Sequence, residues 1–284
     1  MEINNLSIII GTQKGGTTSL FSYLSQHPQI SVSKIKETNF FSKDHQWTKG
    51  IEYYRDLWEW DPDKHLTALE ASPSYTNSLL AVETVIQRIK TIESEFKFIY
   101  LLRNPVQKIE SMRRHGTYQG WYSEFLKKET PTSVPAEVIE RARYAVIVDK
   151  FVDGFSLENI LLLKTEDLRD KPSIVMENVC NFLDLDSSFK FSLGKVHNSE
   201  NSYRTDTIWH LLRNSRYWKP LKNLAPDPLK NKVRGVLAKP LLNDSKTVSP
   251  LTEVQKKFIL DALSDDLVRL ESEYNLDISD WFLY

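Results

Sequence analysis

Disulfides and an excess of charge are both missing from this chain. Its 284 residues include one cysteine, Cys180, so an intrachain disulfide is excluded. A protein without disulfides fits a reducing compartment, or its stability does not depend on the redox state of its surroundings. Lysine and arginine total 37 against 38 aspartates and glutamates, a formal net charge of -1. Global charge therefore gives no reason to expect a nucleic-acid or membrane partner, although a local basic site for an anion is compatible with it.

Long hydrophobic runs are also missing. No stretch approaches the roughly 18 uninterrupted apolar residues that a membrane span needs. The N-terminal MEINNLSIIIG has an acidic residue, a short apolar stretch and no basic segment before it, which is unlike a signal peptide. We therefore expect a cytoplasmic protein. The length and the absence of internal repeats favour one domain over residues 1–284.

What the sequence does contain is an alternation of short apolar runs with helical patterns. The apolar runs predict buried strands at 6–10, 66–69, 96–102 and 159–163, and helical spacing predicts helices at 17–26, 79–92 and 174–183. Strands that alternate with helices indicate a parallel sheet covered on both faces. The sequence therefore predicts an α/β fold with a central parallel β-sheet flanked by helices.

Two polar segments interrupt this pattern. Residues 119–135, QGWYSEFLKKETPTSVP, lose periodicity and gather prolines, which favours a mobile loop or lid. Residues 193–205, LGKVHNSENSYRT, form a second polar segment without a period.

A glycine-rich loop follows the first strand, in SIIIGTQKGGTT. Gly11, Gly15 and Gly16 permit a tight backbone path, and a loop between a buried strand and a helix directs N–H groups and the helix dipole at an anion. Thr17 and Thr18 are suited to cap the helix or to donate hydroxyls to phosphate oxygens. The nucleotide-hydrolase pattern places a lysine at position 17, whereas here Lys14 precedes the two glycines. The loop thus fits a phosphate but departs from the hydrolase version.

The end of the strand at 96–102 shows a second departure. It leads into Arg103, where a magnesium-dependent hydrolase typically ends a strand in aspartate to hold the metal. The sequence therefore predicts no metal site, and a lysine near the scissile bond must neutralise the charge of the leaving group.

These segments together resemble a family. GTQKGGTTSL, then KETNFF at 36–41, LEASPSY at 69–75 and FIYLLRNPVQKIESMRRH at 98–115 occur in the order found in sulfotransferases that use 3'-phosphoadenosine 5'-phosphosulfate (PAPS), with the heparan-type and bacterial branch most alike. Any one motif is weak, but the ordered set is specific. The resemblance implies a P-loop-like sulfotransferase fold, PAPS as the donor and 3'-phosphoadenosine 5'-phosphate (PAP) as the product.

The resemblance also implies roles in donor binding. Lys14 would contact the oxygen that bridges phosphorus and sulfur, where negative charge grows as the bond breaks, so a fixed cation there stabilises the transition state most. Arg103 and Ser111 match the pair that binds the 3'-phosphate. The 193–205 segment resembles the family's late closing segment. The full set of expected donor-binding residues is Gly11, Gln13, Lys14, Gly15, Gly16, Thr17, Thr18, Arg103, Ser111, Lys195, Tyr203 and Arg204.

Two residues are candidates for the general base. Glu37 matches the catalytic glutamate of the heparan-type enzymes, and a carboxylate within hydrogen-bond reach can take the proton of an attacking alcohol or amine. His115 is the alternative on its chemistry alone, because nearby cations would favour its neutral, proton-accepting form. The expected acceptor-binding residues are Phe40, Phe41, Trp47, Tyr53, Ser72 and Tyr75.

One departure concerns the acceptor. Heparan-type enzymes commonly carry a lysine where LEASPSY has Ala71, and that lysine helps to bind or activate the sugar. We therefore expect transfer of a sulfuryl group to a hydroxyl or amine of a small molecule, such as a bacterial natural product. The alternatives are a carbohydrate acceptor, a P-loop kinase and a non-catalytic nucleotide-binding module. Oligomeric state is left open.

Overall fold

The fold is a parallel sheet with helices on both faces, as the alternating pattern predicts. The computed structural model describes residues 3–119, 121–194 and 248–282. Within those ranges five strands pair in the order β2-β3-β1-β4-β5, and every pairing is parallel. The strands are β1 (Asn5–Gly11), β2 (Ile30–Val32), β3 (Thr67–Ala71), β4 (Glu95–Leu102) and β5 (Ile160–Lys164).

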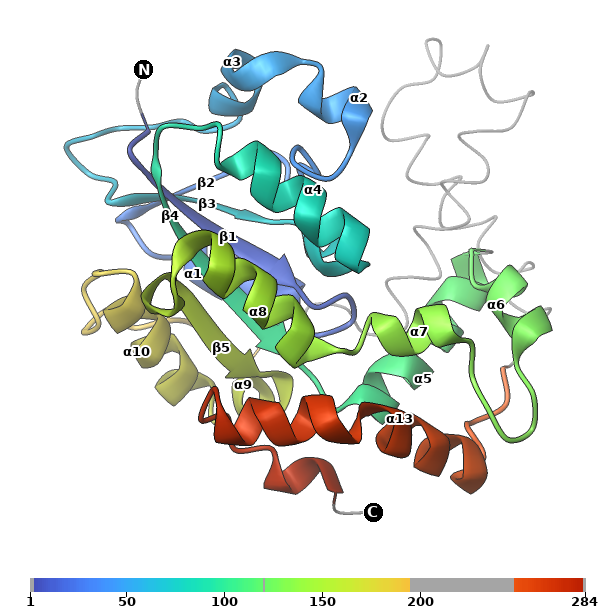
Figure 1. Cartoon of the computed structure of the whole chain (residues 1–284). Coiled ribbons are helices and arrows are strands. Elements are labelled where there is room, and N and C mark those ends of the chain that lie inside the picture. The colour runs from blue at the N-terminus through green and yellow to red at the C-terminus, as the bar shows by residue number, and fades with distance from the viewer. Residues whose placement is uncertain (1–2, 120, 195–247, 283–284) are drawn as a thin grey trace, which may run out of the picture.

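The helices fall into two layers (Figure 1). On one face, α4 (Leu79–Ile89) and α8 (Tyr144–Phe155) pack against alternate strand residues such as Ile8 and Phe98. On the other face, α1 (Thr17–Leu24), α9 (Thr165–Asp170) and α10 (Pro172–Phe182) pack against the intervening residues such as Ile9 and Ile99. Side chains of successive strand residues point to opposite faces, so the continuous apolar runs fill both cores.

Shorter helices and the C-terminal helix complete the described chain. The long α13 packs on α8 and α5. No helix among the described residues combines the length and apolar character needed to cross a membrane. The remaining elements are α2 (Asp44–Trp47), α3 (Gly50–Arg55), α5 (Pro105–Gln119), α6 (Ser123–Lys128), α7 (Ala136–Glu140), α13 (Glu253–Ser272) and the 3-10 helices η1 (Pro73–Thr76), η2 (Leu157–Asn159) and η4 (Ser279–Phe282).

The expectation of a loop at 119–135 is wrong in part, because α6 lies within it. Tyr122 is buried, and the Arg113 guanidinium on α5 forms a buried ion pair with Glu129, with 2.8 Å between Nη2 and Oε2. Six helical residues are too few to show a period, so the pattern did not reveal this helix.

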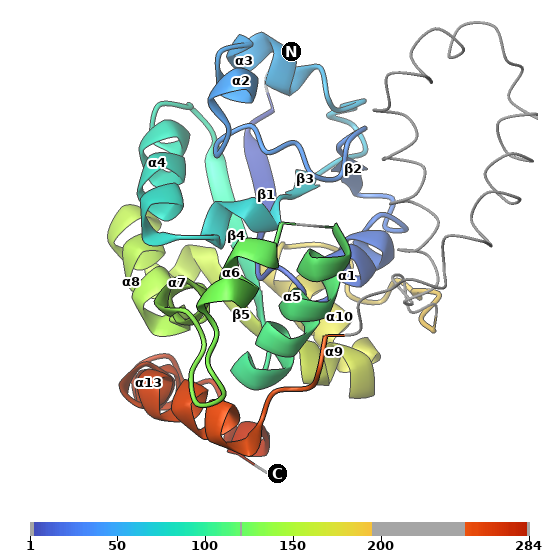
Figure 2. The ribbon, with the colours of Figure 1, turned by 90° about the vertical axis from the view of Figure 1, so that its right-hand side faces the viewer.

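The strand order places the reactive edge. The chain leaves β1 toward β2 on one side of the sheet, and it leaves β4 toward β5 on the other. Open α/β sheets bind ligands outside the carboxyl ends of strands at such a switch point. Figure 2 views this edge, with α1, α5 and α6 around the strand ends.

Candidate active site

The glycine-rich loop packs tightly against the end of β4. A Cβ at Gly15 would lie 2.7 Å from the carbonyl oxygen of Leu101, so no other residue fits without moving the loop. The Thr12 N–H donates to the same carbonyl at 2.8 Å, and the Gly15 N–H donates to the Thr12 carbonyl at 2.9 Å. The loop therefore has one backbone path, set by contact with β4.

The loop ends at the amino terminus of α1. Gly16 occupies the N-cap with φ 86°, a left-handed conformation that suits glycine, and no side chain caps the helix. The cap position belongs to Gly16, so the Thr17 and Thr18 hydroxyls are not caps. The first turn of α1 contains no acidic residue. The Ser19 and Leu20 N–H groups donate to the Gly16 carbonyl, at 2.9 and 3.2 Å. The N–H groups that precede them begin the helix and lie at the positive end of its dipole, which favours an anion.

Lys14 lies in the loop in a left-handed conformation, with φ 68°. Its carbonyl oxygen accepts a hydrogen bond of 2.9 Å from Arg103 Nη1. Burial, followed by the charges of Arg103 and Arg114, lowers the pKa of Lys14 to about 8. Several cations thus lie close together in a partly desolvated site. A bound anion would offset both their desolvation and their mutual repulsion.

Arg103 connects the glycine-rich loop with the start of α5 through hydrogen bonds to Lys14 and Gln107. It follows β4, and its Nη2 donates to Gln107 Oε1 at 3.4 Å. Its Nε is buried and has no hydrogen-bond partner among the described residues. Burial is the main cause that lowers the Arg103 pKa, partly opposed by Glu166. A buried N–H without a partner is costly, so this donor is suited to a ligand oxygen.

The face of α5 that carries Ser111 also presents Arg114. Residues 107, 111 and 114 are spaced by four and three and share one side of the helix. Ser111 is half-buried. Arg114 acts electrostatically on both Lys14 and Arg103, a role that the sequence reasoning did not assign to it. Helical spacing from Ser111 was the signal that could have found it.

His115 also lies within electrostatic range of the loop. Burial, followed by the charge of Lys14, lowers its pKa to about 4, so the imidazole is neutral at pH 7. Its ring centroid lies 6.5 Å from that of Trp121, which precedes α6. The structure thus brings His115 into the neighbourhood of Lys14, in the proton-accepting form.

Glu37 projects from a turn fastened to the end of β3. The Ala71 N–H donates to the Lys36 carbonyl at 3.1 Å, and the Asn39 N–H donates to Ser72 Oγ at 3.0 Å. The Glu37 side chain is 53% exposed and pairs with Lys36 Nζ at 3.0 Å. Because β3 is parallel to β1, Glu37 lies at the same edge of the sheet as the glycine-rich loop.

Glu70, a fully buried carboxylate in β3, stabilises this turn from the core side. Four hydroxyls donate to it, those of Thr38, Tyr54, Ser72 and Tyr75, at 2.5 to 2.9 Å. Burial raises the pKa of Glu70, and these hydrogen bonds oppose the rise. The network fixes the turn while leaving Glu37 at the surface.

The same packing changes the interpretation of the expected acceptor residues. The side chains of Phe40, Phe41, Ser72 and Tyr75 have no exposed surface. Phe40 stacks on Tyr54 at 4.5 Å between ring centroids. These four residues build the core beneath the turn and offer no surface to an acceptor.

The other two expected acceptor residues are half-buried. Trp47 packs on Phe40 with 5.1 Å between ring centroids, and the Arg88 guanidinium lies 5.4 Å from its ring. Tyr53 has Lys49 Nζ 4.2 Å from its ring. Both therefore keep some exposed surface beside the turn. Lys195, Tyr203 and Arg204 lie outside the described residues.

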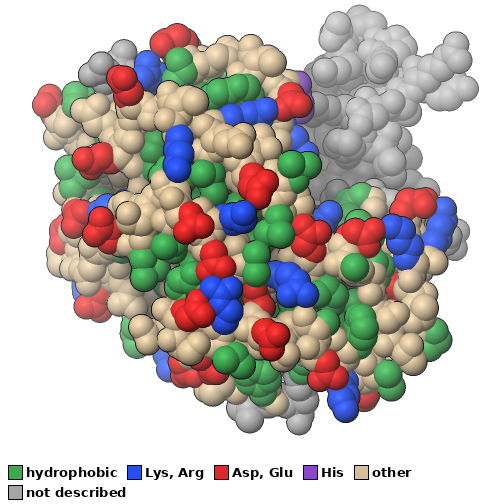
Figure 3. Space-filling view, in the orientation of Figure 1, with side chains coloured by type: hydrophobic (Ala, Val, Ile, Leu, Met, Phe, Trp, Pro, Cys, Tyr) green, Lys and Arg blue, Asp and Glu red, His purple; other side chains and the backbone are tan. Residues whose placement is uncertain are grey.

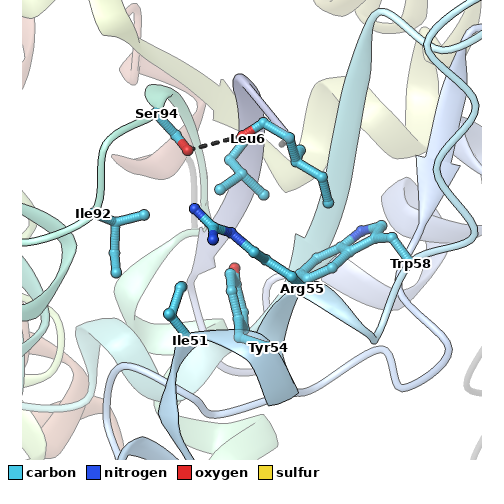
Figure 4. A pocket seen from close by; sticks show the side chains of 8 residues that line it. Leu6, Ile51, Tyr54, Arg55, Trp58, Ile92 and Ser94 are labelled. Atoms are coloured by element: carbon cyan, nitrogen blue, oxygen red, sulfur yellow. Dashed lines mark hydrogen bonds between the residues drawn. The ribbon is translucent and has the colours of Figure 1, made fainter. Parts of the chain in front are cut away.

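A small pocket elsewhere is unsuited to the reaction (Figure 4). It lies at the amino-terminal side of the sheet, beside the starts of β1 and β4, with Arg55 among apolar side chains. Ligands of open α/β sheets bind at the opposite edge. The pocket is lined by Ile3, Leu6, Ile51, Tyr54, Arg55, Trp58, Ile92 and Ser94.

Comparison with known proteins identifies the family. A family model described as "Sulfotransferase domain" matches residues 5–214, which include the loop, the Glu37 turn and α5. The chain belongs to the sulfotransferase family. The sequence resemblance is thereby confirmed at the level of the family, and the sheet and helix layers confirm the predicted fold.

Several sulfotransferases are similar to this chain. "Heparan sulfate glucosamine 3-O-sulfotransferase 5" of Mus musculus is 26% identical over 189 residues, covering 63% of this chain and 53% of that protein. "Bifunctional heparan sulfate N-deacetylase/N-sulfotransferase 1" of Caenorhabditis briggsae is 24% identical over 204 residues, covering 63% of this chain and 22% of that protein. The chain thus spans about half or less of these curated relatives.

A solved structure supports the fold. The sulfotransferase from Alicyclobacillus acidocaldarius has a TM-score of 0.63 and 20% identity, and the match covers 99% of each chain. At this identity the likeness concerns the fold, so the acceptor has to be argued from the site.

Proposed function

We propose that this sulfotransferase moves the sulfuryl group of PAPS to a hydroxyl or amine of a small-molecule acceptor. The observation that carries the proposal is the junction of Lys14 with Arg103. One loop presents a lysine and backbone N–H groups, and the neighbouring strand end presents a buried guanidinium. A donor with phosphates on both the 3' and the 5' oxygen of its ribose matches two such anion sites.

The residues present fit this donor. The loop residues from Gly11 to Thr18 would hold the 5'-phosphosulfate, and Arg103 with Ser111 would hold the 3'-phosphate. The unpartnered Arg103 Nε supports this assignment, because a phosphate oxygen would supply its missing acceptor. The lowered pKa of Lys14 supports it too, because a polyanion would offset the repulsion among Lys14, Arg103 and Arg114.

In the proposed reaction Lys14 stabilises the charge that develops on the departing phosphate oxygen. The acceptor oxygen or nitrogen forms a bond to sulfur while the bond from sulfur to the bridging oxygen breaks, and Glu37 takes the acceptor's proton. Glu70 and Glu166, two carboxylates at this edge, both accept hydrogen bonds from protein donors. Because protein donors already occupy these carboxylate oxygens, they are poorly suited to bind a metal ion, which supports transfer without a metal.

The nature of the acceptor is the finer part of the proposal. At the position where heparan-type enzymes commonly carry a lysine, Ala71 is fully buried, so this position offers an acceptor no cation. On the face seen in Figure 3, acidic and basic side chains are interspersed rather than gathered in one basic field. The buried Ala71 favours a small acceptor, and the single cysteine keeps the cytoplasm as our proposed location.

A carbohydrate acceptor is the second candidate, because the curated relatives are heparan sulfate enzymes. A screen with labelled sulfate donor would compare heparan fragments with small alcohols and amines. Labelling of the fragments alone would overturn the small-molecule proposal while leaving the transfer itself in place.

The experiment that tests the donor assignment is Arg103→Ala. We expect this variant to bind PAP about 100-fold more weakly, while its affinity for adenosine 5'-phosphate (AMP), which lacks the 3'-phosphate, changes little. Calorimetric titration with both nucleotides measures the difference. Arg55→Ala, at an arginine of α3 that lines the pocket on the amino-terminal side of the sheet, is the control. Equal losses for PAP and AMP would assign Arg103 to folding or to the 5' side instead.

The pKa of Lys14 predicts how donor binding depends on pH. A bound phosphate favours the charged amine, so PAP affinity should change little from about pH 7 to 7.5 and should fall as free Lys14 deprotonates through pH 8 and above. The loss should reach roughly tenfold at pH 9, because the phosphates of PAP are already ionised there. Lys14→Arg stays charged and should remove this fall. Identical pH curves for the two proteins would contradict the assignment.

A further inference from the structure

A buried tryptophan near the C-terminus contacts the corner that carries Arg103. Trp281 in η4 is 1% exposed and lies beyond residues 5–214, the part matched by the family model. Asn104, the residue after Arg103, donates from Nδ2 to the Trp281 carbonyl at 2.9 Å, across 177 positions of the chain. The end of the described chain is therefore joined directly to the end of β4.

Glu166 on α9 accepts hydrogen bonds from both Asn104 and Trp281, so that the three residues form a cyclic hydrogen-bond network. Its Oε1 accepts the Asn104 backbone N–H at 3.1 Å, and its Oε2 accepts the Trp281 indole N–H at 3.3 Å. We call Asn104, Glu166 and Trp281 the corner clamp. All three side chains are buried, so the three hydrogen bonds are shielded from water.

The corner clamp acts on Arg103 through the backbone. Asn104 Oδ1 accepts the N–H groups of Val106 and Gln107 and so caps the start of α5. On the other side, the Tyr144 hydroxyl donates to the Arg103 carbonyl at 2.8 Å. The direction of the Arg103 side chain, and of the α5 face with Ser111, therefore depends on where Asn104 is held.

We propose that Trp281 and Glu166 are positioning residues for recognition of the donor's 3'-phosphate, an inference that rests on the proposed function. They touch no donor atom in this proposal. They hold the backbone from which Arg103 extends, and a bidentate guanidinium contact loses affinity when its geometry shifts by a fraction of an ångström. Their effect should therefore appear in the preference for 3'-phosphorylated nucleotides.

The neighbouring Thr165 predicts a contrasting effect. Its hydroxyl is shared between the carbonyl oxygens of Gly15 and Leu102, both at 2.7 Å, so it joins the glycine-rich loop to β4. PAP and AMP both carry the 5'-phosphate. Thr165→Val should therefore weaken both nucleotides and leave their affinity ratio nearly unchanged.

The test measures the affinities of the full-length protein for PAP and AMP by calorimetry. Trp281→Phe keeps an aromatic ring but removes the indole donor. Glu166→Gln keeps the size but cannot accept from both Asn104 and Trp281. We expect each to lower the ratio of PAP to AMP affinity by about tenfold, with AMP affinity little changed. Trp58→Phe is the matched control, since it removes another buried indole hydrogen bond, to Leu69 at 3.2 Å.

The possible outcomes separate the two proposals. Equal weakening of PAP and AMP in Trp281→Phe and Glu166→Gln, or no change in the ratio, would overturn the positioning role while leaving the donor assignment intact. If Trp281→Phe fails to fold, Glu166→Gln decides alone. A wild-type protein that does not prefer PAP over AMP would overturn the proposed donor itself, and the inference with it.

Discussion

Lys14→Ala is expected to lower the rate of sulfuryl transfer by roughly 100- to 1000-fold while weakening PAP binding much less. Lys14 lies in the glycine-rich loop, where its backbone carbonyl accepts a hydrogen bond from Arg103. In the proposed reaction its ammonium group mainly interacts with the negative charge that develops on the departing oxygen as the bond to sulfur breaks. An interaction made chiefly in the transition state affects turnover more than binding. Single-turnover rates and PAP titration would measure the two effects.

The control for this variant is Lys64→Ala, at a lysine whose side chain is 72% exposed and which pairs with Asp61. Its turnover should match the wild type. Equal losses of binding and turnover in Lys14→Ala would indicate uniform binding of ground and transition states, and the leaving-group role would then be wrong.

Glu37→Gln should lower turnover by roughly 100-fold or more and keep most of the PAP affinity, because the amide has the size of the carboxylate but cannot accept the proton. His115→Asn should be milder. Glu59→Gln, at a glutamate whose side chain is 87% exposed, is the control. Turnover and PAP affinity measured for the three variants would assign the base.

The structure also decides which measurement can separate the two candidates. A histidine base with an ordinary pKa would make the rate rise near neutrality, but burial and Lys14 lower the pKa of His115 to about 4. With His115 as the base the rate is therefore expected to be flat from pH 6 to 7.5, so the absence of a rise near neutrality would not exclude it, and the substitutions have to discriminate. An active Glu37→Gln protein beside an inactive His115→Asn protein would place the acceptor against α5.

Much of the fold was predictable because local patterns and burial agree. The runs at 6–10 and 96–102 are apolar on both sides, as central parallel strands require, and they became β1 and β4 with boundaries shifted by one residue. The three-residue β2 (Ile30–Val32) went unpredicted. So short a strand has no period to read, and its pairing with β3 is what defines it.

The residues of the proposed donor site and those of the proposed acceptor site differ in how their motifs relate to the fold. Lys14, Arg103 and Ser111 belong to contiguous motifs, and the structure gathers their loop, strand end and helix at one edge. Phe40 and Phe41 come only three and four residues after Glu37, yet the turn directs the carboxylate outward and both rings into the core. A turn reverses the direction of neighbouring side chains, and its geometry here depends on Glu70, which is distant in sequence.

By itself, the sequence determined the elements and chemistry that contiguous residues encode: the parallel sheet, the glycine-rich loop with its early lysine, the strand-end arginine and the family. Tertiary structure alone decided which groups meet across long separations. It brought Arg114 within electrostatic range of Lys14, it placed Arg113 in a buried ion pair with Glu129, and it joined Trp281 to Asn104 by a hydrogen bond. The physical reason is that charge coupling, burial and hydrogen bonding depend on distance in space, which a pattern along the chain does not encode.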